Sequence, residues 1–183
     1  METVLLVVLF IVVLLLVWFI GVSNRLNRYM VTIKESKATV DIALAKRYDV
    51  ISDLCATVKK FTEHETALIG QLIAVRQGGS IADTNAAIEN QNKVLKQIYA
   101  VGENYPQLLS SELYVNLQKQ IAEQNEYLAA AKRTVNSNIS QLNQVIVTFP
   151  NSIAASLKGM TSMEFLQEVN LEGKMNASVK DML

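Results

Sequence analysis

The sequence predicts an all-α protein, in which an N-terminal transmembrane helix continues into a long antiparallel helical bundle of three main helices and short C-terminal helices. Three observations support this class: an unbroken apolar run at the N-terminus, apolar residues spaced by alternating steps of three and four thereafter, and no competing strand pattern. We expect a transmembrane anchor over residues 1–23, a helical bundle over 24–168 and a mobile tail over 169–183.

Composition excludes several classes of function. Seventeen basic and seventeen acidic residues give no net charge, so nothing in the charge balance favours nucleic acid or another polyanion as a partner. One Cys and one His exclude both a disulfide framework and a Cys/His zinc cluster. We therefore expect no enzymatic activity, no cofactor and no metal site.

The apolar run extends from Val4 to Val22, 19 residues without a charge. At about 1.5 Å per residue it would measure about 28 Å as a helix, which matches a hydrocarbon core of about 30 Å. Trp18 lies near its end, where interfacial aromatic residues collect. A cleaved signal peptide would need a basic N-terminal region and a small-residue cleavage site, and neither is present. The run therefore predicts an uncleaved anchor in the lipid bilayer.

Flanking charge predicts the orientation of this anchor. Glu2 is the only charged side chain before the run, whereas basic residues dominate the segment after it. Because positively charged flanks stay in the cytoplasm, we expect the N-terminus outside and the large domain in the cytoplasm. The flanking residues are Arg25, Arg28, Lys34 and Lys37, against Glu35.

Periodicity predicts that the first helix continues far beyond the membrane, to the Gly78-Gly79 pair. Apolar residues fall on one seam, which Lys37, Arg47 and Glu65 complete, and no proline interrupts residues 1–105. The seam consists of Leu26, Met30, Ile33, Val40, Leu44, Ile51, Leu54, Val58, Phe61, Leu68, Leu72 and Val75.

A second helix is expected from about Asp83, a plausible N-cap, to about Glu103, because Tyr105-Pro106 must interrupt it. Its seam consists of Ala87, Ile88, Gln91, Leu95, Ile98 and Gly102.

A third helix should begin after a cap at Ser110 or Ser111, with Glu112 in its first turn, and end at Phe149-Pro150. Short helices are expected over 152–157 and from Ser162. The seam of the third helix consists of Tyr114, Leu117, Ile121, Gln124, Leu128, Ala131, Val135, Asn138, Leu142, Val145 and Phe149.

The predicted helix lengths suggest an uncovered surface. The second helix, at about 39 Å, can cover only part of a first helix whose soluble portion would measure about 80 Å. The uncovered part should be membrane-proximal, unless the third helix or the C-terminal segment folds back over it. Such an exposed stripe would suit self-association or a partner protein. The candidate residues are Leu26, Met30, Ile33, Val40 and Leu44.

Residues with catalytic potential have simpler explanations. His64 lacks the second histidine of a zincin motif, because Leu68 stands at that position. Cys55 has no nearby histidine in the sequence to activate it and is better interpreted as a buried small apolar residue. Asp49 and Asp53 share a helix face, and Lys46 favours a solvated salt-bridge surface over an acid/base pair.

Polar residues on the two long seams are the most informative candidates. Burying Arg47, Glu65, Gln124 or Asn138 is costly unless each is hydrogen-bonded. They could specify helix register, as polar seam residues do in coiled coils, or form a network that recognises a ligand or partner.

The segment 41–61, DIALAKRYDVISDLCATVKKF, followed by Glu63-His64-Glu65, resembles the LemA family of bacterial membrane proteins. The similarity continues through Asn104-Tyr105-Pro106, Leu117-Gln118 and Phe149-Pro150, and covers residues 1–168. Family members usually have proline where Ser52 stands and tyrosines where Val135 and Leu142 stand. The matched candidates for a surface or buried polar network are Lys46, Arg47, Tyr48, Asp49, Glu63, His64 and Glu65.

The resemblance implies a bacterial inner-membrane protein with one membrane helix, an external N-terminus and a cytoplasmic helical bundle. The family has no established enzymatic activity. Relatives are linked to a membrane metalloprotease of the HtpX type and to membrane invagination in magnetosomes, but neither role is carried over here. Two functions stay open: a self-associating scaffold, expected to be a homo-oligomer, and an adaptor or regulator of a membrane protease or other envelope complex.

Overall fold

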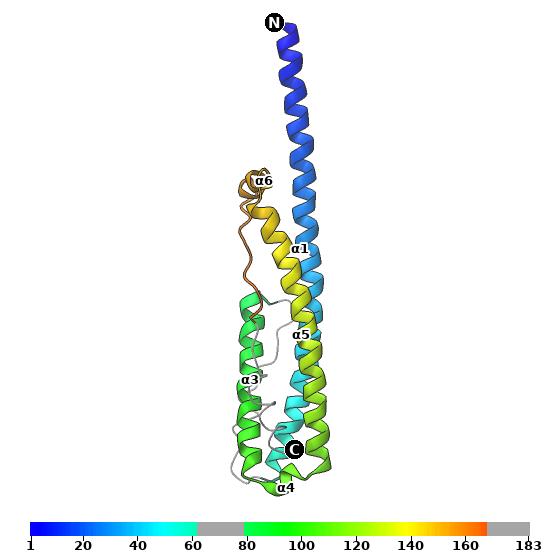
Figure 1. Cartoon of the computed structure of the whole chain (residues 1–183), viewed down its shortest axis with the longest axis vertical. Helices are drawn as coiled ribbons and strands as arrows, with labels where there is room; N and C mark the ends of the chain where they lie inside the picture. The colour runs from blue at the N-terminus through cyan, green and yellow to red at the C-terminus, as the bar shows by residue number, and fades with distance from the viewer. Residues whose placement is uncertain (62–78, 168–183) are drawn as a thin grey trace, which may run out of the picture. The chain divides into compact units, whose positions relative to one another are not determined.

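The computed structural model describes residues 1–61 and 79–167, and every regular element in these ranges is a helix (Figure 1). The all-α prediction is confirmed. The elements are α1 (Glu2–Lys59), α3 (Ile81–Glu103), α4 (Pro106–Leu109), α5 (Glu112–Val147) and α6 (Asn151–Leu157). Contacts divide the chain into two units: unit 1 joins Met1–Thr39 to Ala131–Phe165, and unit 2 joins Val40–Ala130 to Leu166–Leu183.

Helix α1 has 58 residues, and its N-terminal part has no protein neighbour in the described chain (Figure 1). The large apolar side chains from Val4 to Val17, together with Ile20, are all exposed. Their hydrophobicity surrounds the helix instead of forming one stripe, as in a membrane span or a fully buried core helix, and here no described residue covers them. The first part of α1 is therefore long and apolar enough to cross a membrane.

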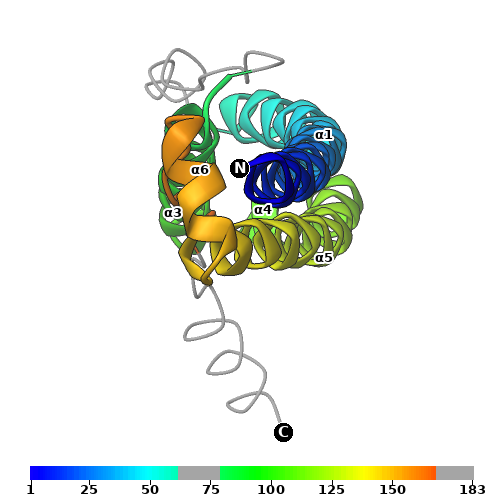
Figure 2. The same cartoon turned by 90° about the horizontal axis from the view of Figure 1, so that it is seen from above.

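In unit 1, the C-terminal part of α5 runs beside α1 (Figures 1 and 2). Asn138, a polar seam position, donates from Nδ2 to Ser36 Oγ at 3.1 Å, which links the two helices. The apolar side chains buried in this unit include Val22, Leu26 and Ile33 on α1 and Val135, Ile139, Leu142 and Val145 on α5.

In unit 2, the last third of α1 packs with α3, α4 and the beginning of α5 around a common core. All six predicted seam residues of α3 are buried, Gln91 among them. The core cluster consists of Ile51, Leu54, Cys55, Val58, Val94, Leu95, Ile98, Leu108, Tyr114, Leu117 and Ile121.

We predicted that the first helix runs to Gly78, which is too far along the chain. Helix α1 ends at Lys59, and the amides of Lys60 and Phe61 bond to the carbonyls three residues before them, at 3.1 and 2.9 Å. These bonds form a tightened last turn of the kind that ends many helices. Apolar residues spaced by steps of three and four indicate which face of a helix is buried, but they do not show where the helix ends. The rest of the predicted seam, Leu68, Leu72 and Val75, lies outside the described residues.

The N-cap of α3 is Ser80 instead of Asp83. Ser80 Oγ accepts from the Asp83 amide at 3.1 Å, and the Asp83 carboxylate accepts from the Ser80 amide at 2.7 Å. This reciprocal capping box satisfies two backbone donors at once, so the helix begins three residues earlier than the carboxylate alone would indicate.

The predicted helix from Ser162 is wrong, because residues 161–167 carry no regular structure. Asn143 of α5 replaces the missing backbone bonds at Met163. Its Nδ2 donates to the Met163 carbonyl at 2.9 Å, and its Oδ1 accepts from the Met163 amide at 2.8 Å. The predicted short helix is confirmed as α6, and the unpredicted α4 begins at Pro106, a favoured first helical position. The predicted mobile tail, 169–183, lies outside the described residues.

The membrane-proximal stripe is mostly covered. Leu26, Ile33, Val40 and Leu44 are buried within the single chain, and only Met30, 42% exposed, is accessible. The exception that we allowed for the third helix applies, because in unit 1 α5 folds back over α1. Burial removes the exposed surface on which we based self-association through these residues; self-association itself stays a prediction.

Seam spacing also fails near helix ends. Phe149, the last predicted seam residue of α5, is 77% exposed because α5 stops two residues before it. By contrast α1 is unbroken at Ser52, and Val135 and Leu142 are fully buried at positions where tyrosine is usual in the family.

Candidate functional site

Arg47 is the largest fully buried side chain in the described part of the chain, with 0% of its surface exposed. It occupies a seam position of α1, three residues after Leu44 and four before Ile51, both of which are buried apolar residues. A helix period of 3.6 residues therefore directs the guanidinium into the core of unit 2.

Two adjacent amides on α3 receive the guanidinium. Arg47 donates from one terminal nitrogen to Asn92 Oδ1 at 2.6 Å and from the other to Gln91 Oε1 at 3.3 Å. Gln91 is held in turn, because its Nε2 donates to the backbone carbonyl of Leu44 at 3.0 Å. The amide of Gln91 thus fixes α3 against α1 through both of its ends.

Electrostatics make this network costly. Burial lowers the pKa of Arg47 to about 10, and the side chain stays protonated at neutral pH. Its described partners are neutral amides, and within residues 1–61 and 79–167 its Nε has no hydrogen-bond partner. The neighbouring charge also acts on Tyr99, whose pKa is raised by burial and by Tyr114 and lowered by Arg47.

The other residues of the matched motif do not join this network. Lys46 and Asp49 are exposed and Tyr48 is half-buried. The ammonium of Lys46 lies 5.8 Å from the centre of the Tyr127 ring, over its face. Lys46 and Asp49 form no ion pair among the described residues, contrary to the predicted salt-bridge surface. The structure therefore separates Arg47 from its sequence neighbours. Glu63, His64 and Glu65 lie outside the described residues.

The residues with catalytic potential lie in environments that suit structural roles. Cys55 belongs to the unit 2 core, and burial raises the pKa of its thiol to about 11, so the nucleophilic thiolate is disfavoured. Asp49 and Asp53 are both exposed, as predicted for a solvated face. In the described ranges, no three His, Cys, Asp or Glu side chains are grouped to hold a metal ion.

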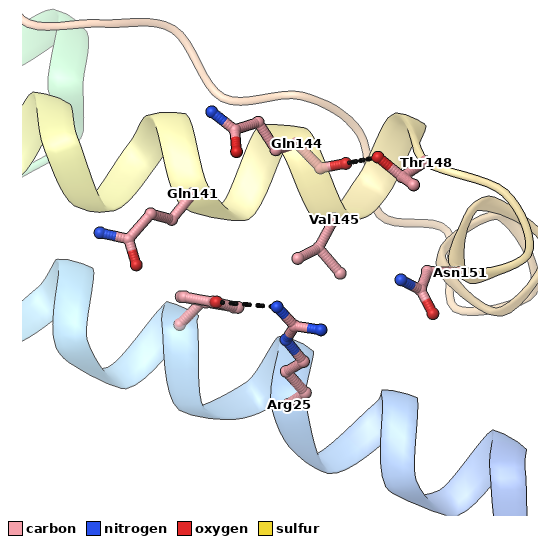
Figure 3. A pocket seen from close by; sticks show the side chains of 7 residues that line it. Arg25, Gln141, Gln144, Val145, Thr148 and Asn151 are labelled. Atoms are coloured by element: carbon pink, nitrogen blue, oxygen red, sulfur yellow. Dashed lines mark hydrogen bonds between the residues drawn. The ribbon is translucent and has the colours of Figure 1, made fainter.

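One open pocket, of about 200 Å³, lies between α1 and α5 in unit 1 (Figure 3). Gln141 and Val145 point from α5 toward α1, and Arg25 reaches up from α1 between them and Asn151. Arg25 also donates to the Tyr29 hydroxyl at 3.4 Å. The lining is Arg25, Tyr29, Gln141, Gln144, Val145, Thr148 and Asn151, a polar set with one cation.

Sequence reasoning found Arg47 and Gln91 but missed Asn92, Asn143 and Lys158. Gln91 lies on the predicted seam of α3, whereas Asn92 lies one residue beside it, where periodicity expects no buried partner. Lys158 follows α6 and donates to Ser23 Oγ and Asn27 Oδ1, both at 2.8 Å. Ser23 and Asn27 precede Lys158 by 135 and 131 positions, and no spacing rule predicts a contact at such a separation.

These features define a class: an all-α bundle protein whose first helix is long enough to cross a membrane and then becomes part of a core with a buried arginine. A family model described as the LemA family matches residues 36–180. The chain belongs to the LemA family, as the motif at residues 41–65 indicated. A comparison with curated proteins finds no match to this chain.

Proposed function

We propose that this protein is a membrane-anchored helical scaffold of the bacterial cell envelope, which self-associates and performs no catalysis. The apolar run of α1 spans the inner membrane once, with the N-terminus outside and the bundle in the cytoplasm. The positively charged segment after the run supports this orientation.

The observation that carries the proposal is the continuity of α1. A single helix extends from the exposed apolar run to the buried network at Arg47, with no break among its 58 residues. An anchor joined to its bundle by a flexible linker would let the bundle rotate freely. A continuous helix instead holds the bundle at a fixed distance and angle from the bilayer, as a scaffold requires.

The absence of catalysis is proposed from the chemistry of the candidate residues. Cys55 is buried with a raised pKa, Asp49 and Asp53 face solvent, and the Arg47 network consists of fixed hydrogen bonds inside a packed core. General acid/base or nucleophilic chemistry needs an activated group in a cleft, which these positions do not provide. A purified chain that turned over a substrate, and lost that turnover on Asp49→Asn, would contradict this part of the proposal.

The second candidate function is an adaptor or regulator of a membrane protease or other envelope complex. Three apolar side chains that are exposed near the junction of α4 and α5 favour it, because another protein could bind them: Leu109, Leu113 and Val115. The two functions differ in what binds the bundle: further copies of this chain, or a different membrane protein.

Native mass spectrometry of the full-length chain in lipid nanodiscs separates these functions. A discrete oligomer supports the scaffold. A monomer would contradict self-association and favour the adaptor, for which affinity capture from native membranes should return a defined membrane protein.

Orientation is tested with single cysteines at Thr3 and at the exposed Lys119, in a Cys55→Ala background. A membrane-impermeant maleimide applied to intact cells should label position 3 alone. Labelling of position 119 alone would reverse the proposed topology.

A further inference from the structure

We propose that α6 and the turn before it form a second membrane contact, in which Phe149, Ile153 and Leu157 enter the headgroup and acyl boundary of the bilayer that α1 crosses. This inference rests on the proposed membrane anchorage. It adds a second attachment to the anchor, so that the bundle is held to the bilayer at two points instead of one.

The first observation is the exposure of this segment. Beyond the apolar run, the three most exposed large apolar side chains in the described residues are Phe149 at 77%, Leu157 at 73% and Val147 at 68%. Ile153, 49% exposed, lies one turn before Leu157 on the same face of α6. The opposite side of α6 is packed, because Ala154 and Ala155 are buried. A short helix with one small-residue face against protein and one apolar face in solvent lacks a partner for the second face.

The second observation is the level at which α6 lies along α1. The Lys158 ammonium donates to Ser23 Oγ and Asn27 Oδ1, both at 2.8 Å. Ser23 directly follows Val22, the last residue of the apolar run, and Asn27 lies about 6 Å further along the helix than Ser23. Lys158 therefore fixes the end of α6 beside the point where α1 leaves the hydrocarbon, and Figure 1 shows α6 at this level.

The backbone after α6 holds this arrangement. Gly159 has a φ of +64°, in the left-handed region that glycine adopts readily. The Met160 amide then bonds to the Ala155 carbonyl at 3.0 Å and the Gly159 amide to the Ser156 carbonyl at 3.0 Å. This end directs the chain away immediately after Lys158, so that Leu157 stays exposed at the tip of α6.

The bilayer is the occupant that these observations favour over another protein. Lys158, the residue after Leu157, contacts Ser23 and Asn27 in the first turn or two after the run, so the end of α6 lies close to where a bilayer would begin. Arg25, Arg28 and Lys158 are at the same level and suit the phosphate groups of lipid headgroups. A helix of this kind lies in the interface with its apolar face about 5–10 Å into the headgroup and acyl boundary.

Fluorescence quenching by lipids brominated near the headgroup end of their acyl chains tests the proposal. The full-length chain is placed in vesicles of phosphatidylcholine and phosphatidylglycerol, with Leu157→Trp in a Trp18→Phe background. The matched control is Val31→Trp, an exposed apolar position of α1 nine residues after the run. Wild-type chain, in which Trp18 is the only tryptophan, reports the anchor independently.

We expect brominated lipid to remove about half of the emission of Trp at position 157, as for a side chain at the headgroup and acyl boundary, and little from position 31. Adding Lys158→Gln should reduce the quenching at 157, because α6 loses its bonds to α1. Quenching of Trp18 without quenching at 157 would overturn this inference and leave the anchor intact. No quenching at either position would overturn the anchor and this contact together.

A second copy of the chain is the other outcome of the test. Oxidation of isolated native membranes with copper phenanthroline would then link Leu157→Cys, in a Cys55→Ala background, into a disulfide dimer, with position 157 unquenched in vesicles. That pair of results would assign the apolar face of α6 to a protein interface and overturn the lipid contact.

Discussion

Two stretches of α1 are both rich in apolar side chains, but they differ in what covers those side chains. From Val4 to Val17 the apolar side chains surround the helix and no part of the described chain covers them. From Val40 to Val58 the apolar side chains form one stripe, which is buried inside unit 2 together with a charged residue, Arg47. One continuous helix thus passes from an apolar stretch that is long enough to cross a membrane to a stretch that is buried in its own protein.

The difference shows what each stretch needs from its surroundings. The first stretch needs no specific partner, because lipid accepts any apolar side chain, but it cannot accept a charge cheaply. The second accepts a charge because specific amides on α3 receive it, and it therefore depends on those partners. A substitution in one stretch of α1 leaves the other stretch as an internal reference.

The largest effect is expected in the first stretch. Replacing Leu9, Val13 and Leu16 by arginine should oppose membrane insertion by about 8–10 kcal/mol, at about 2.5–3.5 kcal/mol for each charge near the helix centre. The variant should be lost from carbonate-washed membranes. The same three positions changed to alanine should stay in the membrane fraction. Retention of the triple arginine variant would contradict the lipid environment of this stretch.

In the second stretch, Arg47→Ala should lower the free energy of unfolding by about 2–5 kcal/mol, because it leaves a cavity and two buried amide oxygens without the guanidinium that they bind. Urea unfolding of the full-length protein in detergent, followed by far-UV circular dichroism, measures this loss. Lys46→Ala, the exposed neighbour on the same turn, is the control and should stay within about 0.5 kcal/mol of wild type.

Replacing the whole network separates its two possible roles. Arg47→Met combined with Gln91→Leu and Asn92→Leu should recover most of the stability lost in Arg47→Ala, because no buried polar group is then left unpaired. If the triple variant stays as unstable as the single one, the network contributes net stability and our electrostatic account of it is wrong.

Unit 2 also contains a steric test of how tightly the second stretch is enclosed. A Cβ at Gly102 would lie 2.7 Å from the Tyr114 hydroxyl oxygen, and the Tyr114 side chain is fully buried, so its displacement would disturb the surrounding core. Gly102→Ala should therefore cost about 1–3 kcal/mol of unfolding free energy. Adding Tyr114→Phe removes the clashing atom and should recover part of that loss; a purely additive double variant would contradict the contact.

The smallest effect concerns pH. Burial raises the pKa of Cys55 from 9.0 to about 11. In the unfolded chain the thiol ionises near pH 9, so the native state binds more protons between pH 9 and 11 and loses stability as the pH rises. Between pH 8 and 10, wild type should lose about 1–2 kcal/mol more than Cys55→Ala, at about 1.4 kcal/mol per unit of pKa shift. Equal pH slopes would place the thiol in water.

Periodicity predicted the fold because burial follows helix geometry. The seams of α1, α3 and α5 identified buried side chains correctly at most positions, including the polar Gln91. It failed where a helix ends, as at Phe149, and where local hydrogen bonds choose the boundary, as at Ser80. Such boundaries depend on a single competing bond and not on a repeated pattern.

The candidate site was predictable only in part. The seam marked Arg47 as a position where an apolar side chain is expected, but it left open whether Arg47 faces a core, a neighbouring protein or water; the structure shows that it is buried. Its partners could not be predicted, because Asn92 lies off the seam of α3. Its contact with the guanidinium depends on how α1 and α3 pack together, which the spacing within one helix does not give. The contact of Lys158 with Ser23 and Asn27 depends likewise on the fold as a whole, and residue type alone gives no signal for it.

The central claim is that α1 is one helix that leaves lipid after Val22 and enters a protein core. Single cysteines along α1, in a Cys55→Ala background of the full-length chain in native membranes, test it by maleimide labelling. We predict protection throughout the run and labelling afterwards on one face only, with Glu35 and Asp49 reactive and Ile33 and Leu44 protected until denaturant is added. Labelling inside the run, or on every face after it, would contradict the claim.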